Sequence, residues 1–139
     1  MSDPFDLQRF VDAQAQTYDQ ALRELRDGAK RTHWMWFVFP QIEGLGRSGM
    51  AQRFAISGLP EARAYLSHPT LGRRLVEACR ALTALDVADP VVVFGPVDAM
   101  KLQSSMTLFA RAAPDEPVFR EVLDHYFAGA EDDGTTSRL

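Results

Sequence analysis

The sequence predicts an all-α, mainly helical protein: a single compact multihelical domain of about six helices, with at most one short extended segment near residues 91–94. Two observations predict this class. Apolar residues recur at helical spacing along most of the chain, and residues typical of helix starts precede these stripes. The length of 139 residues suits one domain with its own core. We expect residues 1–130 to form this domain and residues 131–139, which are acidic and rich in small residues, to be a flexible tail.

Capping and turn residues locate the expected helices. The first apolar stripe predicts one long helix over residues 5–27, with Asp3 as its N-cap and Gly28 as its stop. The other helices are expected over residues 49–56 behind a Ser48 cap, after Pro60 as far as His68, behind a Thr70 cap along a stripe that ends at Leu85, from Pro96 to about Ala112, and from Pro117 to Phe127.

Two short apolar stretches are ambiguous in the sequence. The run from His33 to Pro40 is rich in aromatic residues, which favours a strand, whereas Thr32 as a cap and the flanking helices favour a short buried helix; we prefer the helix. The run Val91–Phe94 has a high strand propensity and lies between Pro90 and Gly95. Because the sequence offers no clear partner strand, we expect an extended link or a small ribbon there.

Charge and cysteine content exclude several classes of function. The formal net charge of −4 argues against sequence-independent nucleic-acid binding, which needs a basic face. The single cysteine, Cys79, lies in an apolar helical stripe and is expected to be buried and inert, and no Cys/His cluster suggests a metal or another cofactor. No apolar run is long enough to span a membrane and no secretion signal is visible, so we expect a cytoplasmic protein. The sequence leaves the oligomeric state and the reaction open.

The aromatic run forms the first candidate site. Trp34 and Trp36 offer a wall of the kind that lines small-molecule pockets, and the imidazole of His33 changes charge near neutral pH, so it suits acid–base chemistry. Gln41 adds a polar group at the end of the run. The alternative is that the aromatic rings fill the core and that His33 is a satisfied core or capping residue.

A glycine-containing loop follows directly. Gly44 and Gly46 permit backbone conformations in which N–H groups converge on an anion, and Ser48 begins a helix whose N-terminus favours negative charge. Arg47 would complete a phosphate or carboxylate site. The loop fits neither the P-loop nor the dinucleotide fingerprint, so a plain connection remains the alternative.

The helix before the last one contains the second candidate site. At about 100° per residue, Asp98, Lys101 and Ser105 share a face with apolar residues, whereas a surface helix would separate the two classes. Polar groups on such a face must pair with one another or point into a wet cavity, because burial without partners is costly. Ser104 and Thr107 add further hydroxyls. The alternative is a local i,i+3 salt bridge whose acidic residue complements the helix dipole.

Several motifs together resemble one known family. They are Asp3-Pro4-Phe5 with Arg9-Phe10, the run from His33 to Gln41 with Gly44-Leu45-Gly46, Tyr65 to Pro69 with Leu71 to Leu75, and Phe94-Gly95 with Asp98, Lys101 and Ser104 to Phe109. These segments are similar to the bacterial family called domain of unknown function 1810, and the resemblance covers nearly the whole chain. It implies a multihelical single domain and brings no established activity. Genomes often label such proteins calpastatin, but that inhibitor class is disordered and repetitive, so we reject the label.

Two classes of function remain. The leading hypothesis is a small-molecule pocket for an anionic or nucleotide-like ligand, formed where the aromatic run meets the second candidate site. If the pocket is catalytic, hydrolysis or group transfer fits best, with His33 or Asp98 as general base and Lys101 as charge stabiliser. The expected ligand-binding residues are Trp34, Trp36, Gln41, Gly44, Gly46, Arg47, Ser48, Ser104, Ser105 and Thr107. The alternative is a non-catalytic protein-interaction module whose polar residues lock the helices together.

Overall fold

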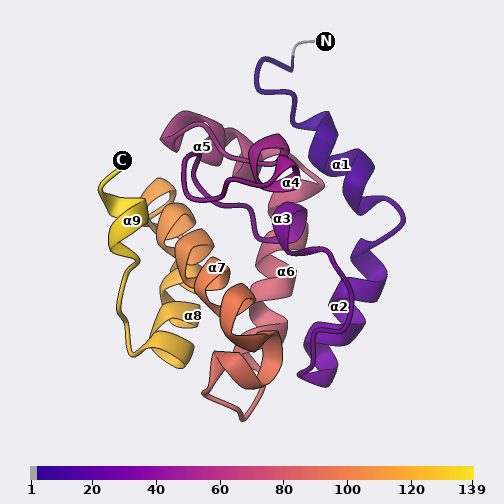
Figure 1. The fold of residues 1–139 in the computed structure, drawn as a ribbon, viewed down its shortest axis with the longest axis vertical. Coiled ribbons are helices and arrows are strands. Elements are labelled where there is room, and N and C mark those ends of the chain that lie inside the picture. The colour runs from indigo at the N-terminus through magenta and orange to yellow at the C-terminus, as the bar shows by residue number, and fades with distance from the viewer. Residues whose placement is uncertain (1–2) are drawn as a thin grey trace.

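The computed structural model describes residues 3–139 and contains nine α-helices and no strand in that range (Figure 1). In chain order the helices are α1 (Gln8–Gln14), α2 (Tyr18–Asp27), α3 (Met35–Val38), α4 (Gly49–Arg53), α5 (Leu59–Ser67), α6 (Leu71–Thr83), α7 (Pro90–Ala112), α8 (Pro117–Phe127) and α9 (Asp133–Thr136). An isolated parallel bridge joins Ile42 and Ile56. The predicted all-α class is confirmed, and the additional helices come from a break in the first helix and from a short helix at the C-terminus. None of the helices described is both long and apolar enough to cross a bilayer.

One apolar core joins the long helices. Helix α6 packs against α2, α5 and α8, and α7 packs against α5, α8 and α9 (Figure 1). Aromatic rings fill the space between them: Tyr65 contacts Phe10 and Phe109, and Trp34 packs edge-on against Phe94. All five side chains are buried, so part of the predicted aromatic wall serves the core instead.

The helix expected over residues 5–27 is two helices, which corrects the prediction. Helix α1 ends at Gln14, whose buried amide donates to the carbonyl of Phe37 (2.7 Å) and to the hydroxyl of Tyr65 (3.1 Å). Helix α2 begins after Thr17, which has a non-helical φ of −127°. Helix α1 packs against α3, whereas α2 packs against α6. A single straight helix could not make both contacts, so tertiary packing overrides the continuous apolar stripe.

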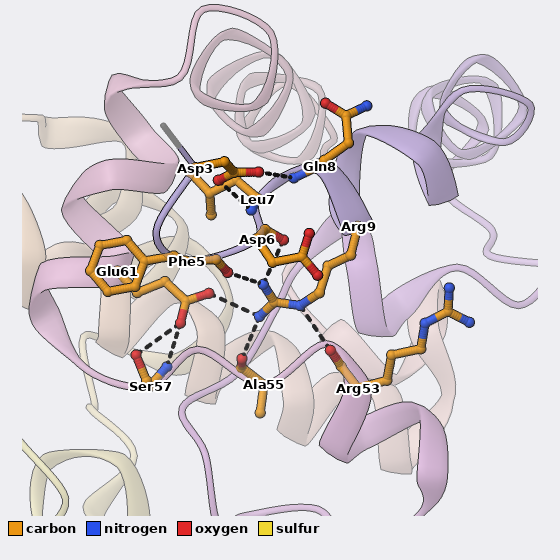
Figure 2. A network of polar contacts seen from close by, with 10 residues as sticks. All are labelled: Asp3, Phe5, Asp6, Leu7, Gln8, Arg9, Arg53, Ala55, Ser57 and Glu61. Atoms are coloured by element: carbon orange, nitrogen blue, oxygen red, sulfur yellow. Dashed lines mark hydrogen bonds and ion pairs between the residues drawn. The ribbon is translucent and has the colours of Figure 1, made fainter. Parts of the chain in front are cut away.

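The Arg9 side chain fixes the N-terminal segment (Figure 2). Its guanidinium donates hydrogen bonds to four backbone carbonyls and one carboxylate, those of Phe5, Asp6, Arg53, Ala55 and Glu61. Glu61 is almost fully buried and also accepts from the backbone N–H and the hydroxyl of Ser57. The carboxylate of Asp3 accepts from the N–H groups of Leu7 and Gln8, but the N-cap position of α1 is Leu7, so the predicted N-cap at Asp3 is wrong. The Arg9 motif therefore ties the first helix to the segment between α4 and α5.

The sequence predicts Ser48 as the cap of α4 and Thr70 as the cap of α6, and the two predictions have different outcomes. Ser48 caps α4, because its hydroxyl accepts from the backbone N–H of Ala51 (3.1 Å), which confirms the prediction. Thr70 occupies the N-cap position of α6, as predicted, but it has helical φ and ψ and its side chain makes no cap hydrogen bond to any residue described, so only the side-chain cap is wrong. The Nδ1 atom of His68 accepts from the N–H groups of Thr70 and Leu71 instead. His68 therefore has a structural role at the start of α6.

The extended link expected at Val91–Phe94 is wrong, because these residues form the first turn of α7. The carboxylate of Asp89 accepts from the backbone N–H of Val91 (2.9 Å). This local start signal outweighs strand propensity where no neighbouring strand can pair. Gly95, with φ +77° and ψ 167°, interrupts the helix, which resumes at Pro96, where the sequence predicts a helix start.

Helices α3 and α9 each test a prediction from the sequence. Helix α3 confirms that the aromatic run is helical and not a strand. At the C-terminus, where a solvated tail over residues 131–139 is expected, Asp132 caps α9 by accepting from Thr135, and Thr135 is fully buried. Helix α9 packs against α7. Composition suggested a solvated segment, but its polar groups have partners within the fold.

Candidate functional site

The two candidate stretches meet around an open hollow of about 280 Å³, which we call the α7 hollow. The loop after α3, one face of α7 and the segment before α9 line it. Its lining residues are Gln41, Leu45, Gly46, Val97, Met100, Lys101, Gln103, Ser104 and Asp132. Four of the predicted site residues, Gln41, Gly46, Lys101 and Ser104, therefore share one wall although they lie far apart in the chain.

Two lysines share one carboxylate beside the α7 hollow. The Nζ atom of Lys30 lies 2.9 Å from Oδ2 of Asp98, and the Nζ atom of Lys101 lies 3.6 Å from Oδ1. The Lys30 side chain is only 8% exposed and also donates to the carbonyl of Thr32 (2.7 Å), so it is held in place. The Lys101 side chain is 24% exposed and lines the hollow. Asp98 thus positions Lys101, and both oxygens of this predicted base already face ammonium groups.

The two tryptophans have different surroundings. Trp34 is fully buried, its indole N–H donates to Glu24 (2.9 Å), and the Nζ atom of Lys30 lies 5.1 Å from its ring centroid. Trp36 is half-buried, and the Nζ atom of Lys101 lies 5.2 Å from its ring centroid. Ammonium groups over an indole at such distances are attracted to the ring. Trp34 therefore belongs to the core, whereas Trp36 is the indole that contacts the lysine of the hollow.

The buried carboxylate of Glu24 shapes the segment that carries Lys30 and Trp34. It accepts hydrogen bonds from the N–H groups of Arg31 and Thr32, the Thr32 hydroxyl, the Trp34 indole and the Gln20 amide. Burial alone raises the pKa of Glu24, but these donors outweigh burial and hold the pKa well below its usual range. Sequence reasoning missed Glu24 and Lys30. The available signals were an acid on the apolar face of its helix and one of only two lysines in the chain.

The hydroxyl groups of α7 mostly hold the C-terminal segment. The Ser104 hydroxyl lies 3.0 Å from the carboxylate of Asp132, and the Thr107 hydroxyl accepts from the backbone N–H of Asp132 (2.9 Å). Ser105 is fully buried, and its hydroxyl has no hydrogen-bond partner among residues 3–139. Of these three predicted ligand-binding residues, Ser104 is the one that lines the hollow.

The glycine loop borders a second hollow of about 370 Å³. Gln41, Gly44, Gly46 and Arg47 contribute to its wall, and Gln41 and Gly46 belong to both hollows. Gly44 has φ +98°, and its carbonyl accepts a hydrogen bond from the guanidinium of Arg138 (3.4 Å). At this point the loop presents a carbonyl oxygen to the C-terminal segment, whereas the sequence suggested converging N–H groups.

The remaining predicted residues lie outside the α7 hollow. His33 is exposed and lines neither of the two hollows, so the structure does not bring its imidazole into the wall that Lys101 shares. The hydroxyl of Ser48 is engaged in capping α4. Cys79 is fully buried, as predicted, and burial raises the pKa of its thiol. Within residues 3–139, no cluster of His, Cys, Asp or Glu side chains is placed to hold a metal ion.

The chemistry available at the α7 hollow is mainly that of hydrogen-bond donors. The ammonium of Lys101 and the amides of Gln41 and Gln103 lie on its wall, and the Gln103 amide also donates to the carbonyl of Ala130. The hydroxyl of Ser104 lies there too, but it already donates within the protein. The carboxylate of Asp132 also lies there, but it already accepts hydrogen bonds within the protein. The arrangement can therefore hold a small polar molecule.

Comparisons with known proteins agree with the motifs. A family model described as "Protein of unknown function (DUF1810)" matches residues 4–139. The chain is also similar to the conserved hypothetical protein Rv1873 from Mycobacterium tuberculosis, whose crystal structure has been solved. The two sequences are 51% identical, the two structures superpose with a TM-score of 0.97, and the match covers 99% of this chain and 98% of that one. No curated protein matches the chain significantly. The resemblance inferred from the motifs is thus confirmed, and the chain belongs to the DUF1810 family.

Proposed function

We propose that the α7 hollow binds a small anionic, nucleotide-like ligand, in which a phosphate or carboxylate group is joined to a flat ring. The observation that carries this proposal is the position of Lys101. Its ammonium lines the hollow between the carboxylate of Asp98 and the half-buried indole of Trp36.

The position of the Lys101 ammonium, and not the net charge, favours an anion. Lys30 and Lys101 carry two positive charges, and Asp98 and Asp132 carry two negative charges, so these four groups balance. The separation of 3.6 Å between Lys101 and Asp98 leaves the ammonium free to donate to a second acceptor. The carboxylate of Asp132 accepts hydrogen bonds from Ser104 and Thr135 and remains a negative group on the wall, so a bound anion has to lie on the Lys101 side of the hollow.

The shape of the hollow sets the size of the ligand. Its volume of about 280 Å³ is near the lower end of the range for small-molecule sites. The second hollow shares Gln41 and Gly46 with it, so a ligand with two parts can extend across the loop. Trp36 lines neither hollow, but its partly exposed ring lies beside the Lys101 ammonium, where a flat group that extends out of the hollow could contact it.

The proposal assigns binding, and not hydrolysis, to this site. Asp98 has an ammonium group at each oxygen, so it acts as a positioning residue for Lys101 and is poorly placed to accept a proton from a ligand. His33, the other base suggested by the sequence, lies outside the wall of the hollow.

Isothermal titration calorimetry with AMP and pyrophosphate as probes tests the proposal. We expect saturable binding by the unmodified protein and a loss of at least about tenfold in affinity for Lys101→Met, which keeps the apolar stem and removes the charge. Arg111→Met is the matched control on the same helix, because Arg111 pairs with Glu131 and does not line the hollow; it should bind like the unmodified protein. Failure of both probes to bind, or unchanged affinity in Lys101→Met, would contradict the proposal.

A further inference from the structure

A larger hollow, of about 790 Å³, lies over α6 and shares no lining residue with the α7 hollow. It is an open groove bordered by the end of α2, one face of α6 and the start of α8. We call it the arginine groove, because Arg26, Arg73 and Arg80 border it. Sequence reasoning did not single out this surface.

The three arginines of the groove have no ion-pair partners among residues 3–139. All three are exposed, and none makes an ion pair among residues 3–139. By contrast, Arg9 and Arg111 each pair with a glutamate. A partner that binds the groove therefore gains guanidinium contacts without breaking internal ion pairs.

Two glutamates also border the groove, but both have internal partners. Glu77 accepts from the hydroxyl of Tyr18 (2.7 Å), and Glu116 caps α8 by accepting from the N–H of Val118 (3.3 Å). Three arginines against two glutamates leave one positive charge, in a chain whose net charge is −4. The groove is thus a locally basic surface on an acidic protein.

The floor of the groove is apolar and its rim is cationic. Val76 and Ala81 are partly exposed and supply apolar surface to the groove, whereas Phe119, which also borders it, is fully buried. Arg73 and Arg80 are seven residues apart on α6, which places them on one face with a separation of about 10 Å along the helix axis. An apolar stripe with charges at its edge is the pattern that receives an amphipathic helix.

We propose that the arginine groove docks an acidic amphipathic helix of a partner protein. The apolar side chains of that helix lie on the groove floor, and two of its carboxylates, seven residues apart, face Arg73 and Arg80. A guanidinium group binds a carboxylate through two parallel hydrogen bonds, so this spacing gives the site its specificity. The groove has a volume of about 790 Å³ against about 280 Å³ for the α7 hollow, which leaves room for several side chains from one face of a helix.

Fluorescence anisotropy with designed peptides tests this proposal. The probe is a labelled helical peptide with leucines on one face and two glutamates at the edge of that face, spaced as Arg73 and Arg80 are. The control peptide has the same composition with the glutamates on the opposite face. We expect the unmodified protein to prefer the probe, and the double variant Arg73→Glu/Arg80→Glu to bind the probe at least about tenfold more weakly.

Two further measurements distinguish binding at the groove from a general effect of the charge on the protein. A peptide with lysines in place of the glutamates should bind the double variant better than it binds the unmodified protein. The control variant Arg47→Glu/Arg53→Glu changes two exposed arginines outside the groove and should keep the affinity for the probe. The proposal is overturned by absent binding, by equal binding of probe and control peptide, or by equal losses in the two double variants. Because the two surfaces share no lining residue, this outcome is independent of the test of the α7 hollow.

Discussion

Two neighbouring serines on α7 have opposite surroundings. The Ser104 hydroxyl lies 3.0 Å from the carboxylate of Asp132, whereas the buried hydroxyl of Ser105 has no partner in the described part of the chain. We expect Ser104→Ala to lower the free energy of unfolding by about 1.5–3 kcal/mol, because it removes a hydrogen bond to a charged group. Ser105→Ala removes an unsatisfied polar group and should leave stability unchanged or raise it. Urea unfolding measures both, and a larger loss for Ser105→Ala would contradict this description of α7.

The carboxylate of Glu24 links stability to pH. Its hydrogen-bond donors hold its pKa in the folded state below the ordinary value of 4.5. Its contribution to stability is therefore fully present above about pH 4.5 and is lost as the pH falls toward the folded-state pKa. We expect Glu24→Gln to lower the free energy of unfolding by about 2 kcal/mol at neutral pH and to reduce the fall in stability in acid.

Glu131→Gln is the control for this experiment. Hydrogen bonding to Arg111 lowers the pKa of Glu131 to about 2 against the effect of burial, but the Glu131 side chain is 23% exposed and its ion pair is screened by water. Urea unfolding of both variants at neutral and acidic pH should show the larger loss at neutral pH for Glu24→Gln. A Glu24→Gln protein with the stability and pH dependence of the unmodified protein would show that the donors do not favour the charged form.

Helices α5 and α6 meet at Gly72 with no space for a side chain. A Cβ atom at this position would lie 2.0 Å from the carbonyl oxygen of Leu66, which is fixed backbone. We expect Gly72→Ala to lower the free energy of unfolding by about 3 kcal/mol. Gly49→Ala is the control, because no atom lies within 4 Å of its Cβ position, and its stability should stay within about 0.5 kcal/mol. Thermal unfolding compares the two, and similar melting temperatures would contradict the close approach of these helices.

Helices whose start signals are local could be predicted from the sequence. Ser48 directly precedes α4 and Pro117 is the first residue of α8, and both helices were expected. The break between α1 and α2 was not expected, because it depends on the amide of Gln14 reaching the distant carbonyl of Phe37. The packed C-terminal segment likewise depends on partners of Asp132 that lie on another helix.

At the candidate site, too, contacts between neighbouring residues could be predicted from the sequence, and contacts between distant segments could not. Asp98 and Lys101 lie about one helical turn apart, so the geometry of a helix predicts their contact. Lys30 reaches the same carboxylate from a distant segment, and Gln41 joins Ser104 around the hollow only through the tertiary fold. Patterns in the sequence identify polar residues on an apolar face, but they do not say which distant segment meets that face.

At the scale of the whole molecule, Asp98 joins the segment after α2 to α7. It holds Lys30 in place and restrains Lys101 at the hollow. Removing its charge frees the Lys101 ammonium for an anion and leaves Lys30 without its ion pair. We expect Asp98→Asn to bind AMP about threefold to tenfold more tightly and to lower the free energy of unfolding by about 1–3 kcal/mol. Calorimetry and urea unfolding measure the two effects, and weaker binding of AMP would contradict the inference that Asp98 competes with the ligand for the Lys101 ammonium.

A titration of the ¹⁵N-labelled protein with AMP, followed by two-dimensional NMR, tests directly whether the α7 hollow is the ligand site. We expect shifts concentrated in the backbone amides of Gln41, Gly46, Gln103 and Ser104, which line the hollow from two separate segments. Shifts concentrated along α6 between Arg73 and Arg80, or no saturable shifts at all, would contradict the assignment of the α7 hollow as a site for small anions.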